Sequence, residues 1–290
     1  MAKSKSSGTR ARVATGVPTA VLAILIVVFG GPWGLAALVT IFVLLGAGEA
    51  ARLLVPKPSP WDRLFVSIGA LACIPALVSG SFELLALVVL VLVPSSAFWA
   101  MAVPDGKDNL VRNVAPRWTG LWVSVLYVGL LPSSAVAVRG LENGVLWVIG
   151  LLGVTYLGDV GAYFSGRAFG KHKLAPRLSP KKTIEGVIGG YVVSVGAFTT
   201  FVLLTGIGGI ALALTVGFAA NTVGIIGDLA ASSIKRAAGV KDSGRFLAGH
   251  GGVLDRIDSV LFSLPVGYLL LRLFFDVGVE WTAGLERLFG

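Results

Sequence analysis

Two aspartates lie in the stretch GHGGVLDRIDS, residues 249–259, where a long apolar segment begins. Asp255 and Asp258 are three residues apart, so on a helix their side chains share one face with Cβ atoms about 5–6 Å apart. The positive end of the helix dipole favours one carboxylate there, but two repel each other unless a cation lies between them. Gly251 and Gly252 let the backbone approach a ligand closely. The pattern predicts a magnesium site, with a simple helix cap as the alternative.

A polar stripe marks the apolar segment before this one. Asn221, Asp228, Ser232 and Lys235 are separated by seven, four and three residues, which places them on one face of a helix. Ionisable groups in such a segment face protein or water and commonly mark a functional site. We therefore expect Asp228 to join the acidic site, with a purely structural Asp–Lys pair as the alternative.

A third group of polar residues lies between 158 and 190. Asp159, Tyr163 and Arg167 follow the four-residue spacing of one helix face. Arg167 is a candidate for binding a phosphate group, because a guanidinium forms charge-assisted hydrogen bonds with phosphate oxygens.

The stretch SPKKT predicts the start of the next helix, with Ser179 as N-cap and Pro180 as the first helical residue. Lys181 and Lys182 would then lie in the first turn, where positive charge opposes the helix dipole. Beside free backbone N–H groups, two lysines form a site suited to phosphate. Ordinary positively charged anchors at the membrane surface are the alternative interpretation.

The composition indicates which elements hold these residues. Of 290 residues, 55% are hydrophobic and 13% charged, against about 25% charged in soluble proteins. Such a chain is expected to be an all-α integral membrane protein without a soluble domain. Nine apolar stretches are long enough to cross a bilayer: 15–30, 33–51, 63–80, 83–103, 118–138, 144–166, 184–206, 208–235 and 257–275.

These spans suggest two membrane regions between short tails. We expect a basic cytoplasmic tail over 1–14, five helices over 15–138 and four helices of a catalytic region over 144–275. The catalytic region carries cytoplasmic loops at 167–183 and 236–256, and a tail follows at 276–290.

The basic residues predict the orientation of the spans, because cytoplasmic loops are rich in Lys and Arg. With the N-terminus in the cytoplasm, only Arg139, Arg272 and Arg287 of the 24 Lys and Arg residues fall on the other side. The net charge of +9 is then mainly topological, which argues against a nucleic-acid partner. A single cysteine, Cys73, excludes an internal disulfide, and two histidines are too few for a zinc site.

The stretch SSIKRAAGVKDSGRFLAGHGGVLDRID, residues 232–258, resembles the signature of the phosphatidate cytidylyltransferase (CDP-diacylglycerol synthase) family. That pattern is S-x-apolar-K-R, four residues, K-D, then H-G-G-apolar-x-D-R-apolar-D. The upstream block AYFSGRAFGKHKLAPRLSPKKTIEG is similar to a second block of the family. The likeness covers the C-terminal half, and Ala248 departs from it, since Pro or Gly is usual there.

The resemblance implies that CTP and phosphatidic acid give CDP-diacylglycerol and pyrophosphate, with magnesium, and potassium beside it, as cofactors. It implies Asp228, Asp255 and Asp258 as metal ligands. The residues expected to act in catalysis are Asp228, Lys235, Asp255, Arg256 and Asp258. Those expected to bind substrate are Arg167, Lys181, Lys182, Ser232, Arg236, Lys241, Asp242, His250, Gly251 and Gly252. Membrane lipids are further partners, and the glycine-rich faces permit a homodimer.

The expected location is the bacterial inner membrane, with the active site facing the cytoplasm. A CTP-dependent lipid kinase is the nearest alternative enzyme. A cation-coupled transporter is the alternative from another class, but it would place its acidic residues near the bilayer midplane. A CDP-alcohol phosphotransferase is disfavoured, because its terminal aspartates are four residues apart rather than three.

Overall fold

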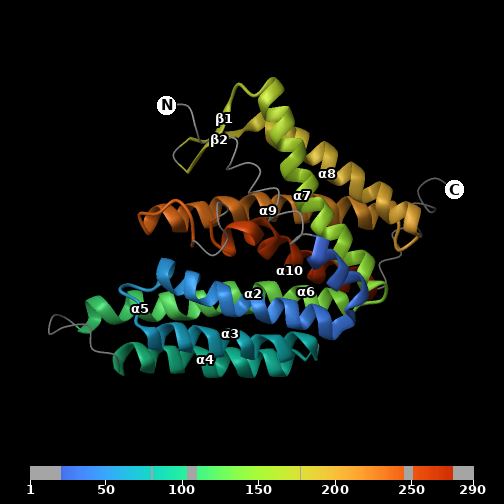
Figure 1. Cartoon of the computed structure of the whole chain (residues 1–290). Helices are drawn as coiled ribbons and strands as arrows, with labels where there is room; N and C mark the ends of the chain where they lie inside the picture. Colours follow the sequence, from blue (N-terminus) through green and yellow to red (C-terminus); the bar gives the residue numbers. More distant parts are fainter. Residues whose placement is uncertain (1–20, 80, 103–109, 177, 245–250, 277–290) are drawn as a thin grey trace. The chain divides into compact units, whose positions relative to one another are not determined.

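The computed structural model describes residues 21–79, 81–102, 110–176, 178–244 and 251–276. Nearly all of them are helical, which confirms the predicted all-α fold (Figure 1). Residues 21–29 form a helix, and the further helices are α2 (Gly31–Leu54), α3 (Pro60–Val78), α4 (Phe82–Ala102), α5 (Leu110–Val125), the π-helical segment η1 (Leu126–Leu130), α6 (Leu131–Arg139), α7 (Gly144–Phe169), α8 (Ile184–Thr205), α9 (Ile210–Ala237) and α10 (Leu254–Asp276).

Eight stretches of the described chain are helices long and apolar enough to cross a membrane, and they match eight of the nine predicted spans. The remaining span, 15–30, lies partly outside the described residues. The predicted span 118–138 is built from α5, η1 and α6, which form one candidate crossing over Val114–Arg139. The chain is a multi-pass membrane protein.

The helices group into two compact units that do not follow the chain order. The first unit comprises Met1–Leu141 and Ala230–Asp258, and the second comprises Glu142–Leu229 and Ser259–Gly290. The end of α9 and the start of α10 therefore belong with the N-terminal helices, although the sequence favours grouping them with α7 and α8.

In the first unit, α2 to α6 pack alongside one another around a core of small and branched apolar side chains (Figure 1). Ser59 caps α3 through a reciprocal pair of hydrogen bonds with Asp62, and Pro60 occupies the first helical position. Asp62 is fully buried and also accepts hydrogen bonds from Trp99 at 3.1 Å and Arg117 at 2.5 Å. Arg117, one of the basic residues predicted on the cytoplasmic side, is a buried member of α5, where the carboxylate of Asp62 neutralises its charge.

The π-helical segment η1 packs against α3 in the same unit. A side chain on Gly129 would place its Cβ 2.6 Å from the Cα of Ala70, so only glycine fits this contact. One wider turn of this kind shifts the helix register, and such turns are frequent at functional sites. Here η1 carries Tyr127, which is buried and lines a small pocket described below.

In the second unit, α7 packs closely along α8 through facing glycines. A Cβ on Gly161 would lie 2.9 Å from Val193 Cβ, and one on Gly190 would lie 2.9 Å from the carbonyl oxygen of Gly158. Small residues let two helix backbones approach this closely, which is how membrane helices gain packing energy. Close backbone approach therefore holds α7 against α8 in the second unit.

A short antiparallel hairpin joins α7 to α8. Strand β1 (Lys173–Ala175) pairs with β2 (Ser179–Thr183), with Lys173 opposite Thr183. The helix predicted with Ser179 as its N-cap and Pro180 as its first residue instead starts at Ile184, with Thr183 as its N-cap accepting from the Gly186 N–H.

The predicted helical setting of Lys181 and Lys182 is therefore wrong. Both residues lie on β2, whose backbone pairs with β1, so they do not lie in the first turn of a helix. Local sequence favoured Ser-Pro as a helix start, but pairing with the preceding strand and the cap at Thr183 move the helix start four residues on.

Candidate active site

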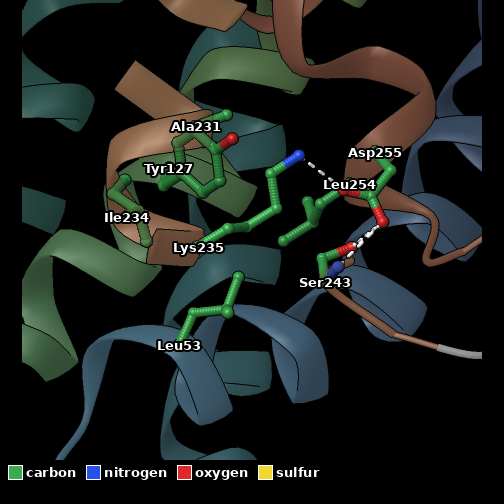
Figure 2. Close-up of a pocket in the computed structure, with 8 residues that line it drawn as sticks. All are labelled: Leu53, Tyr127, Ala231, Ile234, Lys235, Ser243, Leu254 and Asp255. Atoms are coloured by element: carbon green, nitrogen blue, oxygen red, sulfur yellow. Dashed lines mark hydrogen bonds and ion pairs between the residues drawn. The ribbon is translucent and has the colours of Figure 1, made fainter. Parts of the chain in front are cut away.

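Asp255, near the start of α10, is hydrogen-bonded through both of its carboxylate oxygens. Its Oδ1 lies 2.7 Å from the Nζ of Lys235 on α9. Its Oδ2 accepts from the Ser243 N–H at 2.8 Å, the Ser243 hydroxyl at 3.0 Å and the Gly252 N–H at 2.9 Å. Figure 2 shows Lys235 and Ser243 reaching this carboxylate from two different segments. The carboxylate is held in one orientation by four donors.

Asp258 lies on the same side of α10 as Asp255, as the three-residue spacing predicted. Its Oδ2 is 3.8 Å from the Nζ of Lys235, which thus interacts with both carboxylates. The side chains of Lys235, Asp255 and Asp258 are 12%, 9% and 15% exposed. A positive charge therefore lies beside both acidic groups, in a setting largely shielded from solvent.

The two glycines before α10 are required by the geometry of the loop. Gly251 has φ of +80°, a left-handed conformation that side chains rarely adopt, and a Cβ there would lie 2.7 Å from Asp255 Oδ2. A Cβ on Gly252 would lie 2.1 Å from the Ser243 hydroxyl and 2.4 Å from Oε2 of Glu49. In this structure the close approach that glycine permits is to protein carboxylates.

A small pocket opens beside Lys235 and Asp255 (Figure 2). It is formed within the first unit, and its lining is Leu53, Tyr127, Ala231, Ile234, Lys235, Ser243, Leu254 and Asp255. Five of these residues are apolar and flank the charged pair. An ion pair against apolar walls interacts more strongly than one in water.

The second unit holds another part of the predicted site. Lys182 of β2 forms a salt bridge with Asp228 of α9, and each side chain is about a quarter exposed. Asp159 of α7 lies within electrostatic range of both groups. The hairpin thus brings a lysine of the SPKKT stretch to the aspartate of the polar stripe, a contact between residues 46 positions apart.

Glu185 supports this hairpin. Its carboxylate accepts from the backbone N–H groups of Lys171 at 3.1 Å and His172 at 3.2 Å, and lies 2.7 Å from the His172 ring. The carboxylate therefore ties the start of α8 to the first residues after α7.

The other predicted substrate residues lie nearer the surface. Arg167 contacts the Tyr163 hydroxyl at 3.4 Å, and the Arg236 guanidinium donates to the Val240 carbonyl at 3.1 Å. Four further residues are exposed, namely Lys181, Lys241, Asp242 and Arg256, while Ser232 is half-buried on α9. His250 and Ala248 lie outside the described residues. Accessible basic side chains of this kind suit an anionic substrate arriving from water.

A sequence profile of the cytidylyltransferase family matches residues 10–274 of the chain. The chain belongs to the cytidylyltransferase family. It is 36% identical over 250 residues to a phosphatidate cytidylyltransferase of Pseudomonas aeruginosa, covering 83% of this chain and 86% of the relative. A phosphatidate cytidylyltransferase of Staphylococcus haemolyticus is 37% identical over 208 residues, covering 67% of this chain and 79% of the relative.

The match to a third cytidylyltransferase is shorter. The Bacillus subtilis phosphatidate cytidylyltransferase is 41% identical over 155 residues, which is 52% of this chain and 57% of the relative. The family match extends over both halves of the chain, whereas the motifs recognised in the sequence covered only the C-terminal half.

Three residues beside the cytidylyltransferase motifs were missed in the sequence. Ser243 directly follows the Lys-Asp pair of the signature and holds Asp255 through both its N–H and its hydroxyl. Glu49 of α2 and Tyr127 of η1 come from the N-terminal half. Glu49 is an acidic residue within the predicted apolar span 33–51, but nothing in its neighbourhood in sequence indicates its partners.

The carboxylates of this cytidylyltransferase fit a hard divalent cation by their chemistry, since magnesium prefers carboxylate oxygens. Asp255 and Asp258 both face the positive charge of Lys235, so the two acidic groups converge rather than diverge. Within each unit taken by itself, the described residues hold no group of three His, Cys, Asp or Glu side chains able to share a metal. The set of Asp228, Asp255 and Asp258 stays a prediction.

Proposed function

We propose that this protein transfers the cytidylyl group of CTP to phosphatidic acid, giving CDP-diacylglycerol and pyrophosphate. The observation that carries the proposal is that Lys235 lies beside both Asp255 and Asp258, the two aspartates at the start of a membrane-spanning helix, in the segment that carries the family signature. The family match and the names of the relatives support the same reaction.

The proposed reaction is a direct displacement at phosphorus. A phosphate oxygen of phosphatidic acid attacks the α-phosphorus of CTP, and the bond from that phosphorus to the oxygen bridging to the β-phosphate breaks. Pyrophosphate leaves with the bonding electrons, and a new P–O–P linkage joins the lipid to CMP. Because the attacking phosphate is already anionic, no strong general base is needed. The work left to the protein is positioning and charge stabilisation.

Basic side chains in this proposal offset the charge of the two phosphate-bearing substrates. Lys235 is the best placed, because its ammonium already lies in a shielded site beside Asp255. Lys182 likewise pairs with an aspartate, Asp228, in the second unit, where each side chain is about a quarter exposed. The exposed Arg236, Lys241 and Arg256 are proposed to meet the triphosphate of CTP. Lys181, Lys182 and Arg167 are proposed for the lipid phosphate or pyrophosphate.

Magnesium is the proposed cofactor, held by Asp228, Asp255 and Asp258, with potassium beside it. When bound, it would neutralise negative charge on the nucleotide phosphates. Asp242 is proposed as a nearby carboxylate. Ser243 and Gly252 orient Asp255 by donating hydrogen bonds to Oδ2, so that the carboxylate keeps its direction whichever cation faces Oδ1.

The site is proposed to face the cytoplasm of a bacterial inner membrane, where CTP is available. The supporting argument is the distribution of basic residues along the sequence. The variant Lys241→Cys tests this orientation. In intact cells, a cysteine on the cytoplasmic side is protected from a maleimide that does not cross the membrane, whereas a cysteine on the other side is labelled. A homodimer through glycine-rich faces stays a prediction. Measuring the mass of the purified protein in detergent tests it.

The reaction is tested with CTP labelled at the α-phosphate in nanodiscs containing phosphatidic acid. Label should appear in the lipid and depend on magnesium, whereas a CTP-dependent kinase would transfer only the γ-phosphate and a transporter would transfer neither. Asp255→Asn should lower turnover at least about 100-fold, because it removes a charge from the site. Near-normal turnover in that variant would overturn the metal role of Asp255.

A further inference from the structure

Glu49 is a buried carboxylate outside the motifs of the C-terminal half. It lies on α2 and is 2% exposed. An acidic group inside an apolar span is costly to bury unless it is hydrogen-bonded, and such groups usually have a function. The role of Glu49 must therefore be sought in the groups that bind it.

Among the residues that the structure describes, the hydrogen-bonding partners of Glu49 lie about two hundred residues away, at Ser243 and at the start of α10. Oε1 accepts from the Val253 N–H at 3.0 Å, and Oε2 accepts from the Leu254 N–H at 3.0 Å. These are N–H groups without a partner inside the helix, which an anion at the helix N-terminus satisfies. Glu49 thus caps α10 from another helix.

Glu49 also shares a hydroxyl group with Asp255. The Ser243 Oγ lies 2.8 Å from Glu49 Oε2 and 3.0 Å from Asp255 Oδ2. A serine hydroxyl has one proton to donate, so the two carboxylates compete for it or share it. Any movement of Glu49 is therefore transmitted to the side chain that orients Asp255.

The backbone of the loop lies close against the carboxylate of Glu49. A Cβ on Gly244 would lie 2.2 Å from Glu49 Oε1, and a Cβ on Gly252 would lie 2.4 Å from Oε2. Gly244, directly after Ser243, and Gly252, before α10, thus bring the backbone close to one carboxylate. A carboxylate used only to cap a helix would not need this second contact to Ser243.

We propose that Glu49 is a positioning residue for Asp255. By holding the first turn of α10 and the Ser243 hydroxyl together, Glu49 aims Asp255 at the cation of the site. The inference rests on the proposed function, because it assigns Asp255 to the metal. It also gives the N-terminal half of the chain a direct part in building the site. A purely structural cap is the alternative to be tested.

The decisive variant is Glu49→Gln, which keeps the shape of the side chain. Its amide nitrogen would face a donor N–H or the serine hydroxyl in place of an acceptor oxygen, so the network cannot form as before. Mn²⁺ binding to the purified protein, measured by electron paramagnetic resonance, reports the site without turnover. We expect the Mn²⁺ dissociation constant to rise about 10-fold or more, as for other groups that orient metal ligands.

Asp62→Asn is the matched control. Asp62 is equally buried in the same unit, and its hydrogen bonds within the described part of the chain are to Ser59, Trp99 and Arg117 rather than to the site residues named above. It should lower the thermal unfolding temperature and leave the Mn²⁺ dissociation constant unchanged. If Glu49→Gln behaves in the same way, the positioning role is overturned and only a structural cap remains.

Ser243→Ala keeps the proposal testable if Glu49→Gln does not accumulate in the membrane. It removes only the shared hydroxyl and leaves the backbone contacts of Glu49 intact. We expect weaker Mn²⁺ binding in this variant and less than additive losses in the double variant, because one network is disrupted twice. A wild-type Mn²⁺ affinity in Ser243→Ala would overturn the proposal by itself.

The proposed function can fail separately. A wild-type protein that binds Mn²⁺ but transfers no label from α-labelled CTP to lipid would contradict the reaction and leave the Glu49 network standing. Normal lipid labelling by the wild type, together with an unchanged Mn²⁺ affinity in Glu49→Gln and Ser243→Ala, would contradict only the positioning role.

Discussion

The ammonium group of Lys235 lies 2.7 Å from Oδ1 of Asp255 and 3.8 Å from Oδ2 of Asp258. A lysine near the end of α9 thus interacts with two aspartates at the start of α10. This relation explains how two like charges are tolerated close together at the edge of an apolar helix, since an opposite charge lies beside both of them.

Lys235→Met should separate the roles of the two charges. We expect turnover to fall about 100-fold to 1,000-fold, because a preorganised positive charge is lost from a shielded site. Mn²⁺ binding should not weaken, because removing an ammonium cannot lower the attraction of Asp255 for a cation. Steady-state kinetics and Mn²⁺ titration of the same preparation check both expectations, and a parallel loss of metal binding would contradict the second.

Gly252→Ala should disable the site through one added carbon. Its Cβ would lie 2.1 Å from the Ser243 hydroxyl and 2.4 Å from Glu49, so the loop before α10 must move. A displacement of about 1 Å at a reacting group can cost about 100-fold in rate, which is the loss we expect. The assay is the transfer of label from α-labelled CTP to lipid, normalised to folded protein.

Gly196→Ala is the control for that variant. Gly196 is an exposed residue of α8, and a Cβ there would meet no other atom within 4 Å. Alanine in a helix is favoured over glycine by about 0.5–1 kcal/mol, so activity should be unchanged and stability equal or higher. Equal activity losses in the two glycine variants would contradict the steric explanation.

Thr183→Val should destabilise the start of α8. The threonine hydroxyl accepts from the Gly186 N–H, and valine has the same shape without an acceptor. Loss of an N-cap costs about 1 kcal/mol, so the thermal unfolding temperature in detergent should fall. Thr183→Ser keeps the acceptor and should preserve most of the stability. Ser179→Ala should have no comparable effect on the unfolding temperature. A larger loss in Ser179→Ala than in Thr183→Val would instead support the helix start first predicted from SPKKT.

Local patterns in the sequence were sufficient for much of this protein. Apolar runs of sufficient length predicted eight spans that the structure describes as helices, because a bilayer imposes both length and polarity on each segment. Three-residue spacing placed Asp255 and Asp258 on one side of a helix, and the structure shows both facing Lys235. The signature residues were sufficient to predict the family, because they lie in one short continuous segment.

The start of α8 depended on contacts that local sequence does not contain. Ser-Pro followed by lysines has a good local preference for a helix start, yet β2 forms because its backbone pairs with β1. Thr183 could have been identified as a cap, but choosing between Ser179 and Thr183 requires knowing where the strand pairing ends.

The chain by itself determined the membrane class, the helix spans and the identity of the acidic and basic groups, because each of these depends on neighbours within a few turns. Only the tertiary structure decided that Glu49 and Ser243 meet, and that their shared hydroxyl reaches Asp255. Those residues are 194 positions apart, and no periodicity or motif links them. Their contact results from packing α2 against the start of α10, where the buried carboxylate finds the donors that it needs.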